Sequence, residues 1–260
     1  MLSNSSQGKR MDHIVHLDLA LWLGGATFFT GALTAIMGVG GGVMLLAIMA
    51  SLLPGGAIIP IHGLAQSYSN GFRAGLNFSY IQWHVVTAFV AGMVIGTILA
   101  GLIIFQLDPG YIKTGLGFFI ILQVSGYFPA SIFIHPKQRF WSAGMIGVMS
   151  MFFGAPGPLV ATAIRQMGVE KRNYAGTHAA VMVILHGTKV LTFVGLGFAY
   201  TEYWPIIIAI IIGSSCGTFL GQQLMNRLSA PVFKKALTYT LIAVGLQLVL
   251  SGFYTIYLSL

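Results

Sequence analysis

The chain has 260 residues, of which 56% are hydrophobic and only 7% are charged. Soluble domains carry about a quarter of their residues as charges, so this composition excludes a surface that faces water on all sides. The net charge of +8 could suggest nucleic acid, but Lys and Arg fall in short clusters between apolar segments. That distribution is typical of the cytoplasmic loops of membrane proteins, and we predict no nucleic-acid partner.

A polar N-terminal segment, 1–18, precedes a series of apolar segments that continues to the end of the chain. Segments of about 20 residues can cross a bilayer, and backbone groups in lipid must be bonded within the segment, which predicts helices. We therefore predict an all-α polytopic membrane protein. In chain order the segments are Leu19–Met37, Val43–Leu53, 62–78, 84–105, 113–134, Trp141–Phe153, Leu159–Met167, 174–199, 205–226 and 236–258, and a loop is expected at Leu53–Ile61.

The two halves of the chain share a collinear series of residues. Gly38–Gly42 aligns with Gly154–Pro158 at an offset of 116, and further along Trp83 aligns with Trp204 at an offset of 121. The change of offset implies an insertion of five residues near Phe193–Tyr200. We predict two related membrane repeats, which cover residues 19–134 and 135–260.

The two repeats are predicted to have opposite orientations in the membrane. The second has basic loops at Arg165–Arg172 and Arg227–Lys235, and the loop between them, Thr201–Trp204, has no Lys or Arg. Counting crossings back from the basic loop His135–Arg139 places the matching loops of the first repeat on the opposite sides. Inverted repeats of this kind are a common plan of secondary transporters.

Each repeat begins with a pair of apolar segments joined at a glycine motif. As helices, Trp141–Phe153 and Leu159–Met167 would reach only about 20 and 15 Å, which is short of a bilayer core of roughly 30 Å. We therefore predict that each repeat is a re-entrant helical hairpin followed by three transmembrane helices. The first-half pair, Leu19–Met37 and Val43–Leu53, is longer and fits this pattern less well.

The glycine motifs are the first candidate for a binding site. Glycine permits close approach of a ligand to the backbone, and the helices that begin near Val43 and Leu159 would direct free N–H groups to the centre of the protein. Such helix starts bind anions. Close helix packing, which also favours glycine in membranes, is the alternative. The candidate residues are Gly38, Gly40, Gly41, Gly42, Gly154, Ala155 and Gly157.

The first motif, GALTAIMGVGGG at Gly31–Gly42, and its weaker echo at Gly144–Pro158 resemble the sulfite exporter TauE/SafE family of membrane permeases. The resemblance extends over both halves, from Leu21 to Leu250, although Pro156 and Pro158 depart from the usual glycine-rich form. It implies a substrate such as sulfite, a sulfonate or sulfoacetate.

Each repeat has a cationic side chain at the matching position inside a predicted helix. Arg73 and Lys189 occupy matching positions, and all five carboxylates lie in or near loops. A buried cation is costly unless it is paired or hydrated, and an anionic substrate would offset its charge. The lack of a buried acid also disfavours transport of metal cations or amines. Snorkelling of Arg73 to the headgroups is the alternative.

Further polar residues share faces of the same helices. His62 and His178 begin matching segments, Asn70 and His186 lie two turns later, and Gln66 lies between the first pair. These side chains could donate hydrogen bonds to an oxyanion, and a histidine could couple transport to protons. Interfacial anchoring and bonds between helices are the alternatives.

We predict a secondary membrane transporter for a small sulfur-containing anion, with alternating access to a central site between the repeats. An anion channel of the same architecture is the alternative. No nucleophile pattern or phosphate-binding loop is present, so we predict no enzyme activity, no cofactor and no metal site. The expected partners are the anion, the lipid bilayer and a coupling ion, a proton or another, and the expected location is the cell (inner) membrane, spanned several times.

Overall fold

The computed structural model describes residues 3–37, 40–104, 107–125, 138–154, 156–224 and 230–259. Among these residues the regular structure is entirely helical. The α-helices are α1 (Ser3–Met37), α2 (Gly41–Leu52), α3 (Gly55–Leu76), α4 (Trp83–Ile104), α5 (Pro109–Ser125), α7 (Arg139–Phe153), α8 (Gly157–Gln166), α9 (Lys171–Gly195), α10 (Trp204–Leu224) and α11 (Ala230–Ser259). Two short 3-10 helices, η1 (Phe78–Tyr80) and η2 (Tyr200–Tyr203), precede α4 and α10.

The order and spacing of the helices recur along the chain. Helices α2 and α8 begin at residues 41 and 157, and α3 and α9 at 55 and 171, so both pairs are 116 residues apart. Helices α4 and α10 begin at 83 and 204, and α5 and α11 at 109 and 230, which is a spacing of 121 residues. The five additional residues therefore lie in the long α9 and the connection that follows it, where the sequence predicts the insertion.

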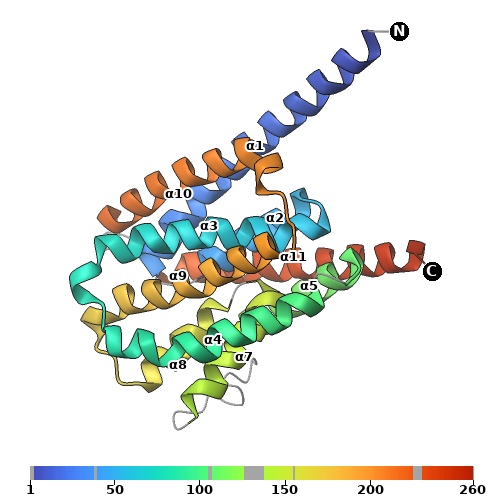
Figure 1. Cartoon of the computed structure of the whole chain (residues 1–260). Helices are drawn as coiled ribbons and strands as arrows, with labels where there is room; N and C mark the ends of the chain where they lie inside the picture. Colours follow the sequence, from blue (N-terminus) through green and yellow to red (C-terminus); the bar gives the residue numbers. More distant parts are fainter. Residues whose placement is uncertain are drawn as a thin grey trace.

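Helix α1 packs along α10 in the same direction, and α4 packs along α7 in the same way (Figure 1). Gly24 contacts Ala209, and further along both helices Gly221 contacts Ala32. The helices approach closely because glycine at the contact has no side chain. In each pair, the first helix of one half of the chain packs against the second long helix of the other half.

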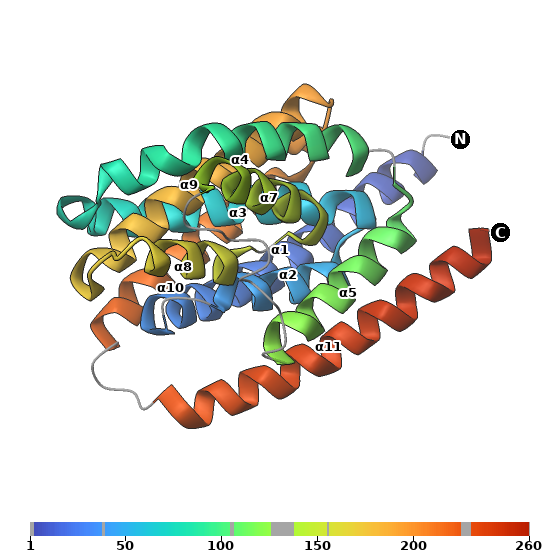
Figure 2. The ribbon, with the colours of Figure 1, turned by 90° about the horizontal axis from the view of Figure 1, so that it is seen from below.

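The remaining major contacts are between corresponding helices. Helices α3 and α9 run side by side. Gly63 lies against Lys189 and the later residue Gly71 lies against the earlier residue Val183, which shows that the two helices run in opposite directions. Helices α5 and α11 also run in opposite directions and form one edge of the molecule (Figure 2). The centre of the bundle is thus α3 with α9, and the ends of α2 and α8 approach it.

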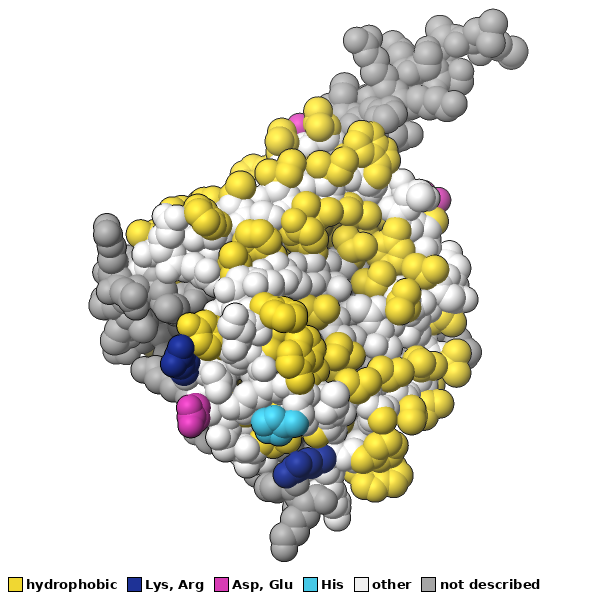
Figure 3. All heavy atoms as spheres, turned by 60° about the vertical axis from the view of Figure 1, so that its left-hand side comes forward, with side chains coloured by type: hydrophobic (Ala, Val, Ile, Leu, Met, Phe, Trp, Pro, Cys, Tyr) yellow, Lys and Arg dark blue, Asp and Glu magenta, His cyan; other side chains and the backbone are white. Residues whose placement is uncertain are grey.

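Five helices among the described residues are long and apolar enough to cross a membrane: Leu17–Ile36, Trp83–Ile104, Arg172–Gly195, Tyr200–Leu224 and Leu241–Leu258. Their outward faces carry many exposed hydrophobic side chains, and Lys and Arg lie toward one end of the face in Figure 3. The chain is therefore a multi-pass membrane protein. Helix α3 has 22 residues but is less apolar, since polar side chains line its buried face.

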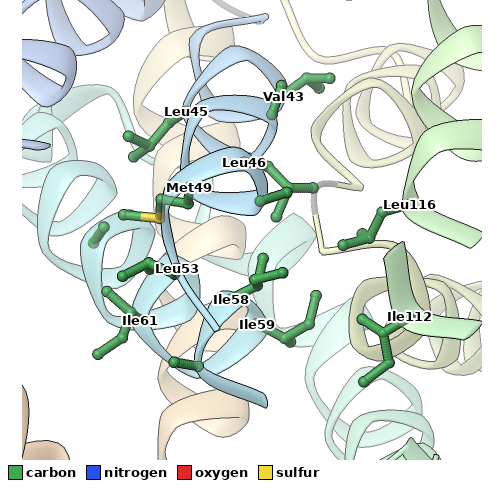
Figure 4. Packing of buried hydrophobic residues seen from close by; sticks show 14 of the residues in the cluster. Val43, Leu45, Leu46, Met49, Leu53, Ile58, Ile59, Ile61, Ile112 and Leu116 are labelled. Atoms are coloured by element: carbon green, nitrogen blue, oxygen red, sulfur yellow. The ribbon is translucent and has the colours of Figure 1, made fainter. Parts of the chain in front are cut away.

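A large apolar cluster fills the end of the molecule where α3, α5 and α10 begin. It is built around α2 and the first turns of α3, and its fully buried members include Leu46, Met49, Ile58 and Ile61 (Figure 4). We call it the apolar plug. Because interiors are close-packed, this cluster excludes water from that end of α3.

Two expectations about the first half are corrected by the structure. Helix α3 begins at Gly55, so the loop expected at Leu53–Ile61 is only a short turn. Pro60 lies inside the helix near its start, where it removes a single intrahelical bond. The first segment of the expected hairpin, Leu19–Met37, is part of the 35-residue α1, and this helix includes a candidate membrane span. Helices α2, with 12 residues, and α8, with 10, are too short to cross a bilayer core.

Candidate functional site

Each half contains a sharp backbone bend at its glycine motif. Gly40, which precedes α2, has a φ of 107°, and Gly154, which follows α7, has a φ of 72°. Side chains with a Cβ rarely adopt these values, so glycine is required at both positions. Gly38 and Ala155, two of the candidate residues, lie outside the described residues.

The starts of α2 and α8 and the middles of α3 and α9 enclose a small cavity, which we call the central cavity. Its volume is about 20 Å³, which is room for about one water molecule. No Asp or Glu is among the described residues that line it. These are Thr34, Gly40, Gly42, Val43, His62, Gln66, Asn70, Arg73, Gly157, Pro158, His178, Met182 and His186.

Two histidines hold the two helix starts in the same way. His62 Nε2 lies 2.9 Å from the carbonyl oxygen of Gly42, and His178 Nε2 lies 3.2 Å from that of Gly157. A carbonyl oxygen only accepts hydrogen bonds, so Nε2 carries the hydrogen in both rings. Each histidine therefore ties the start of its short helix to the long helix that follows it.

Arg73 lies at the centre of a hydrogen-bonded group and is only 5% exposed. Its Nη2 donates to Asn70 Oδ1 at 2.9 Å and to His178 Nδ1 at 3.0 Å. Asn70 in turn donates through Nδ2 to the backbone oxygen of Gln66 at 2.8 Å. The guanidinium group is thus held inside the protein and does not snorkel to the headgroups.

Lys189 is fully buried, and its Nζ donates to the carbonyl oxygen of Gly154 at 2.9 Å. It does not line the central cavity, although it lies one turn from His186, which does. The ammonium group therefore contacts the bend after α7 directly. Its positive charge remains close to the cavity.

His186 differs from the other two histidines because neither of its ring nitrogens has a hydrogen-bond partner among the described residues. Nδ1 of His62 also has none there, and the two rings lie edge to face with centroids 5.7 Å apart. Both side chains are fully buried. A buried polar atom without a partner is unfavourable, so these nitrogens are free to bond to a molecule that enters the cavity.

Gly41 was expected to line the binding site, but it faces a neighbouring helix instead. A Cβ there would meet the backbone oxygen of Thr30 and the hydroxyl of Thr34, so Gly41 packs against α1 and does not line the cavity. Among the lining residues that were not predicted, Thr34 and Met182 are the clearest. Thr34 belongs to a threonine series on α1, Thr27, Thr30 and Thr34, whose helical spacing is a polar signal in an apolar segment.

A wider hollow of about 200 Å³ adjoins the central cavity, and we call it the vestibule. The two share Thr34, Arg73 and His178. Half-buried Asn77 and Tyr174 also line it, so it reaches the surface where α3 ends and α9 begins. This is the end of the molecule that carries the basic loop before α9.

Aromatic contacts mark both ends of the central helices. Beside the vestibule, the Tyr174 ring stacks on His178, and the guanidinium of Arg165 lies 5.5 Å from the centre of the Tyr174 ring. At the opposite end, the Tyr200 hydroxyl donates to the backbone oxygen of Pro60 at 3.4 Å beside the apolar plug. Access to the cavity is therefore asymmetric in this structure.

Comparison with known proteins gives a consistent result. The family model described as Sulfite exporter TauE/SafE matches residues 23–248. The chain is also similar to the "Probable inner membrane transporter protein TsaS" of Comamonas testosteroni, with 26% identity over 225 residues that cover 82% of this chain and 89% of the relative. No solved structure matches the chain. The chain belongs to the TauE/SafE family of membrane transporters.

Proposed function

We propose that the protein is a secondary transporter that binds a small sulfur-containing anion, of the sulfite, sulfonate or sulfoacetate class, in the central cavity. The observation that carries this proposal is the chemistry of the lining. The side chains bring a buried guanidinium and several nitrogen donors together, without a carboxylate among the described lining residues. An anion bound there would offset that charge at membrane depth.

The two helix starts add backbone donors to the cavity. Gly42 and Val43 lie in the first turn of α2, and Gly157 begins α8, and all three line the cavity. The first N–H groups of a helix have no intrahelical acceptor and carry a partial positive charge. An oxyanion between the two starts would accept hydrogen bonds from both halves of the chain.

The size of the central cavity implies that binding opens it. A volume of about 20 Å³ accommodates about one water molecule, and an oxyanion with three oxygens is larger. The vestibule, at about 200 Å³, has room for such an anion. We infer that the anion enters the vestibule first and that Arg73, which lines both spaces, contacts it as the cavity widens.

We further infer that the halves form inverted repeats that expose the cavity alternately to the two sides of the membrane. The opposite directions of α3 and α9 and the recurring spacing of helix starts support an inverted relationship. The vestibule lies at the end with the basic loops, which the positive-inside rule assigns to the cytoplasm. The present conformation would then admit an anion from the cytoplasm, while the apolar plug closes the other side.

The name of the Comamonas relative places that protein in the inner membrane, and we propose the same location for this chain.

A channel of the same architecture would need the apolar plug to open at the same time as the vestibule. Flux through reconstituted protein separates the two mechanisms. Rates far above about a thousand per second would indicate a pore, because a carrier completes a μs–ms conformational step in each cycle.

Thermal unfolding of the purified protein tests the proposed substrate class. A ligand that binds only the folded state raises the unfolding temperature with its concentration. We expect sulfite, thiosulfate, sulfoacetate or taurine to raise it, and carboxylates of similar size to have a weaker effect. Equal or absent shifts across all these anions would contradict a site for sulfur oxyanions.

A further inference from the structure

We propose that a second, smaller pocket beside the central cavity binds a sodium ion that is transported together with the anion. We call it the hydroxyl pocket. It lies between α1, α2, α3 and α10, has a volume of about 10 Å³, and is lined by Thr27, Thr30, Thr34, Gln66, Ser69 and Ser214 among others. The inference rests on the proposed anion transport, and it names the ion that would drive it.

The hydroxyl groups of α1 present oxygen lone pairs to this pocket. Thr27 Oγ1 donates its hydrogen to the backbone oxygen of Gly24 at 2.9 Å, and Thr34 Oγ1 donates to that of Thr30 at 2.8 Å. A hydroxyl has a single hydrogen, so a group that has donated it can only accept or coordinate. Hard cations prefer such oxygen ligands. The central cavity presents N–H groups instead, so adjoining spaces have opposite chemistry.

Ser214 on α10 completes the pocket from the other side. Its side chain is 2% exposed, and its Oγ has no hydrogen-bond partner among the described residues. An unsatisfied buried hydroxyl destabilises the folded protein, and a bound ion would remove that cost. The pocket has room for about one particle the size of water, so it admits a partly dehydrated monovalent cation and not a polyatomic anion.

The positions of the two spaces predict that the ions bind cooperatively. Thr34 and Gln66 line both the hydroxyl pocket and the central cavity. The described residues that line the pocket include no Asp or Glu, and buried Arg73 and Lys189 lie nearby, so a sodium ion alone gains no formal counter-charge. An anion in the cavity would supply that charge. By linkage, each ion then raises the affinity for the other by the same factor.

Calorimetry of sulfite binding to the purified protein tests this proposal. The affinity is measured in sodium chloride and in choline chloride of equal concentration. We expect at least fivefold tighter binding in sodium. The Ser214→Ala and Thr30→Val variants should reduce the difference to less than twofold while retaining the affinity seen in choline. The Ser215→Ala variant is the matched control, because Ser215 Oγ bonds to Ile211 and Tyr68 away from the pocket. It should retain the full effect of sodium.

Three results would overturn the sodium site. Equal affinity in both salts would mean that the pocket holds only water, and the proposed anion transport would remain intact. A sodium effect that survives both Ser214→Ala and Thr30→Val would place the ion elsewhere. The absence of sulfite binding in either salt would contradict the proposed function itself, and the sodium site would fall with it because its counter-charge would be missing.

Discussion

Arg73 on α3 donates a hydrogen bond from Nη2 to Nδ1 of His178 on α9, with the two atoms 3.0 Å apart. A guanidinium cannot accept, so His178 accepts through Nδ1 and donates through Nε2 to the backbone oxygen of Gly157. A continuous line of hydrogen bonds therefore connects the first half of the chain, through Arg73, to the start of α8 in the second half. The candidate binding groups of the two halves are connected by this line.

Replacing Arg73 tests the role of its charge. Arg73→Gln should lower the affinity for the anion more than tenfold, which corresponds to about 1.4 kcal/mol, because Arg73 is the only Lys or Arg among the described residues that line the central cavity. Isothermal calorimetry with the anion found by thermal screening measures this change. Arg172→Gln is the control, since Arg172 is exposed and stacks on Tyr80. An affinity loss below twofold in Arg73→Gln would remove Arg73 from the site.

Adjacent glycines of the first motif should respond differently to the same substitution. A Cβ at Gly42 would lie 3.0 Å from Gln66 Oε1 at the cavity, whereas one at Gly41 would clash with the backbone of Thr30 on α1. We expect Gly42→Ala to weaken anion binding with little change in thermal stability. Gly41→Ala should instead destabilise the protein by about 1–3 kcal/mol, as overpacked cores do. Comparable stability losses in both variants would show that both positions serve helix packing.

Lys189 should contribute more to binding than to stability. Lys189→Met keeps most of the side-chain volume and removes a buried charge, and replacing buried charges by apolar groups is often neutral or stabilising. We expect an unchanged or higher unfolding temperature together with at least tenfold weaker anion binding. An unfolding temperature that falls by several degrees with unchanged binding would make Lys189 a structural tie to Gly154.

The orientation of the two halves can be tested with single cysteines on a Cys216→Ser background. Ser79, Gln138, Gln166 and Thr201 are all exposed. We expect membrane-impermeant thiol reagents to label cysteines at Ser79, Gln138 and Gln166 from the same side, and a cysteine at Thr201 from the opposite side. Labelling of Gln138→Cys and Gln166→Cys from different sides would refute the hairpin formed by α7 and α8.

The helix boundaries illustrate what the sequence can predict. Apolar segments of about 20 residues located nearly all the long helices, and Trp83 and Trp204 stand at the starts of α4 and α10. The start of α3 was missed because Leu53–Ile61 was expected to be a loop, whereas the helix begins at Gly55 and contains Pro60 in its second turn. Local chemistry therefore predicts where helices exist better than where they begin.

Which side chains face the cavity, and which partners they contact, could be determined only from the packing of the helices. Gly41 and Gly42 are neighbours in a helix, so they point in directions about 100° apart, and the sequence does not reveal which one faces α1. Likewise, the pairing of Arg73 with His178 and of Lys189 with Gly154 depends on how α3, α7 and α9 are placed together. The matched positions of the polar residues were visible in the sequence, but their partners were not.

A crystal structure with selenite in place of sulfite would test the central binding site most directly, because the anomalous signal of selenium locates the anion without ambiguity. We expect one selenium peak between the starts of α2 and α8, within hydrogen-bonding reach of Arg73 and His186, and a cavity wider than about 20 Å³. A peak only at surface Lys or Arg residues, with the central cavity unchanged, would contradict anion binding at the centre of the protein.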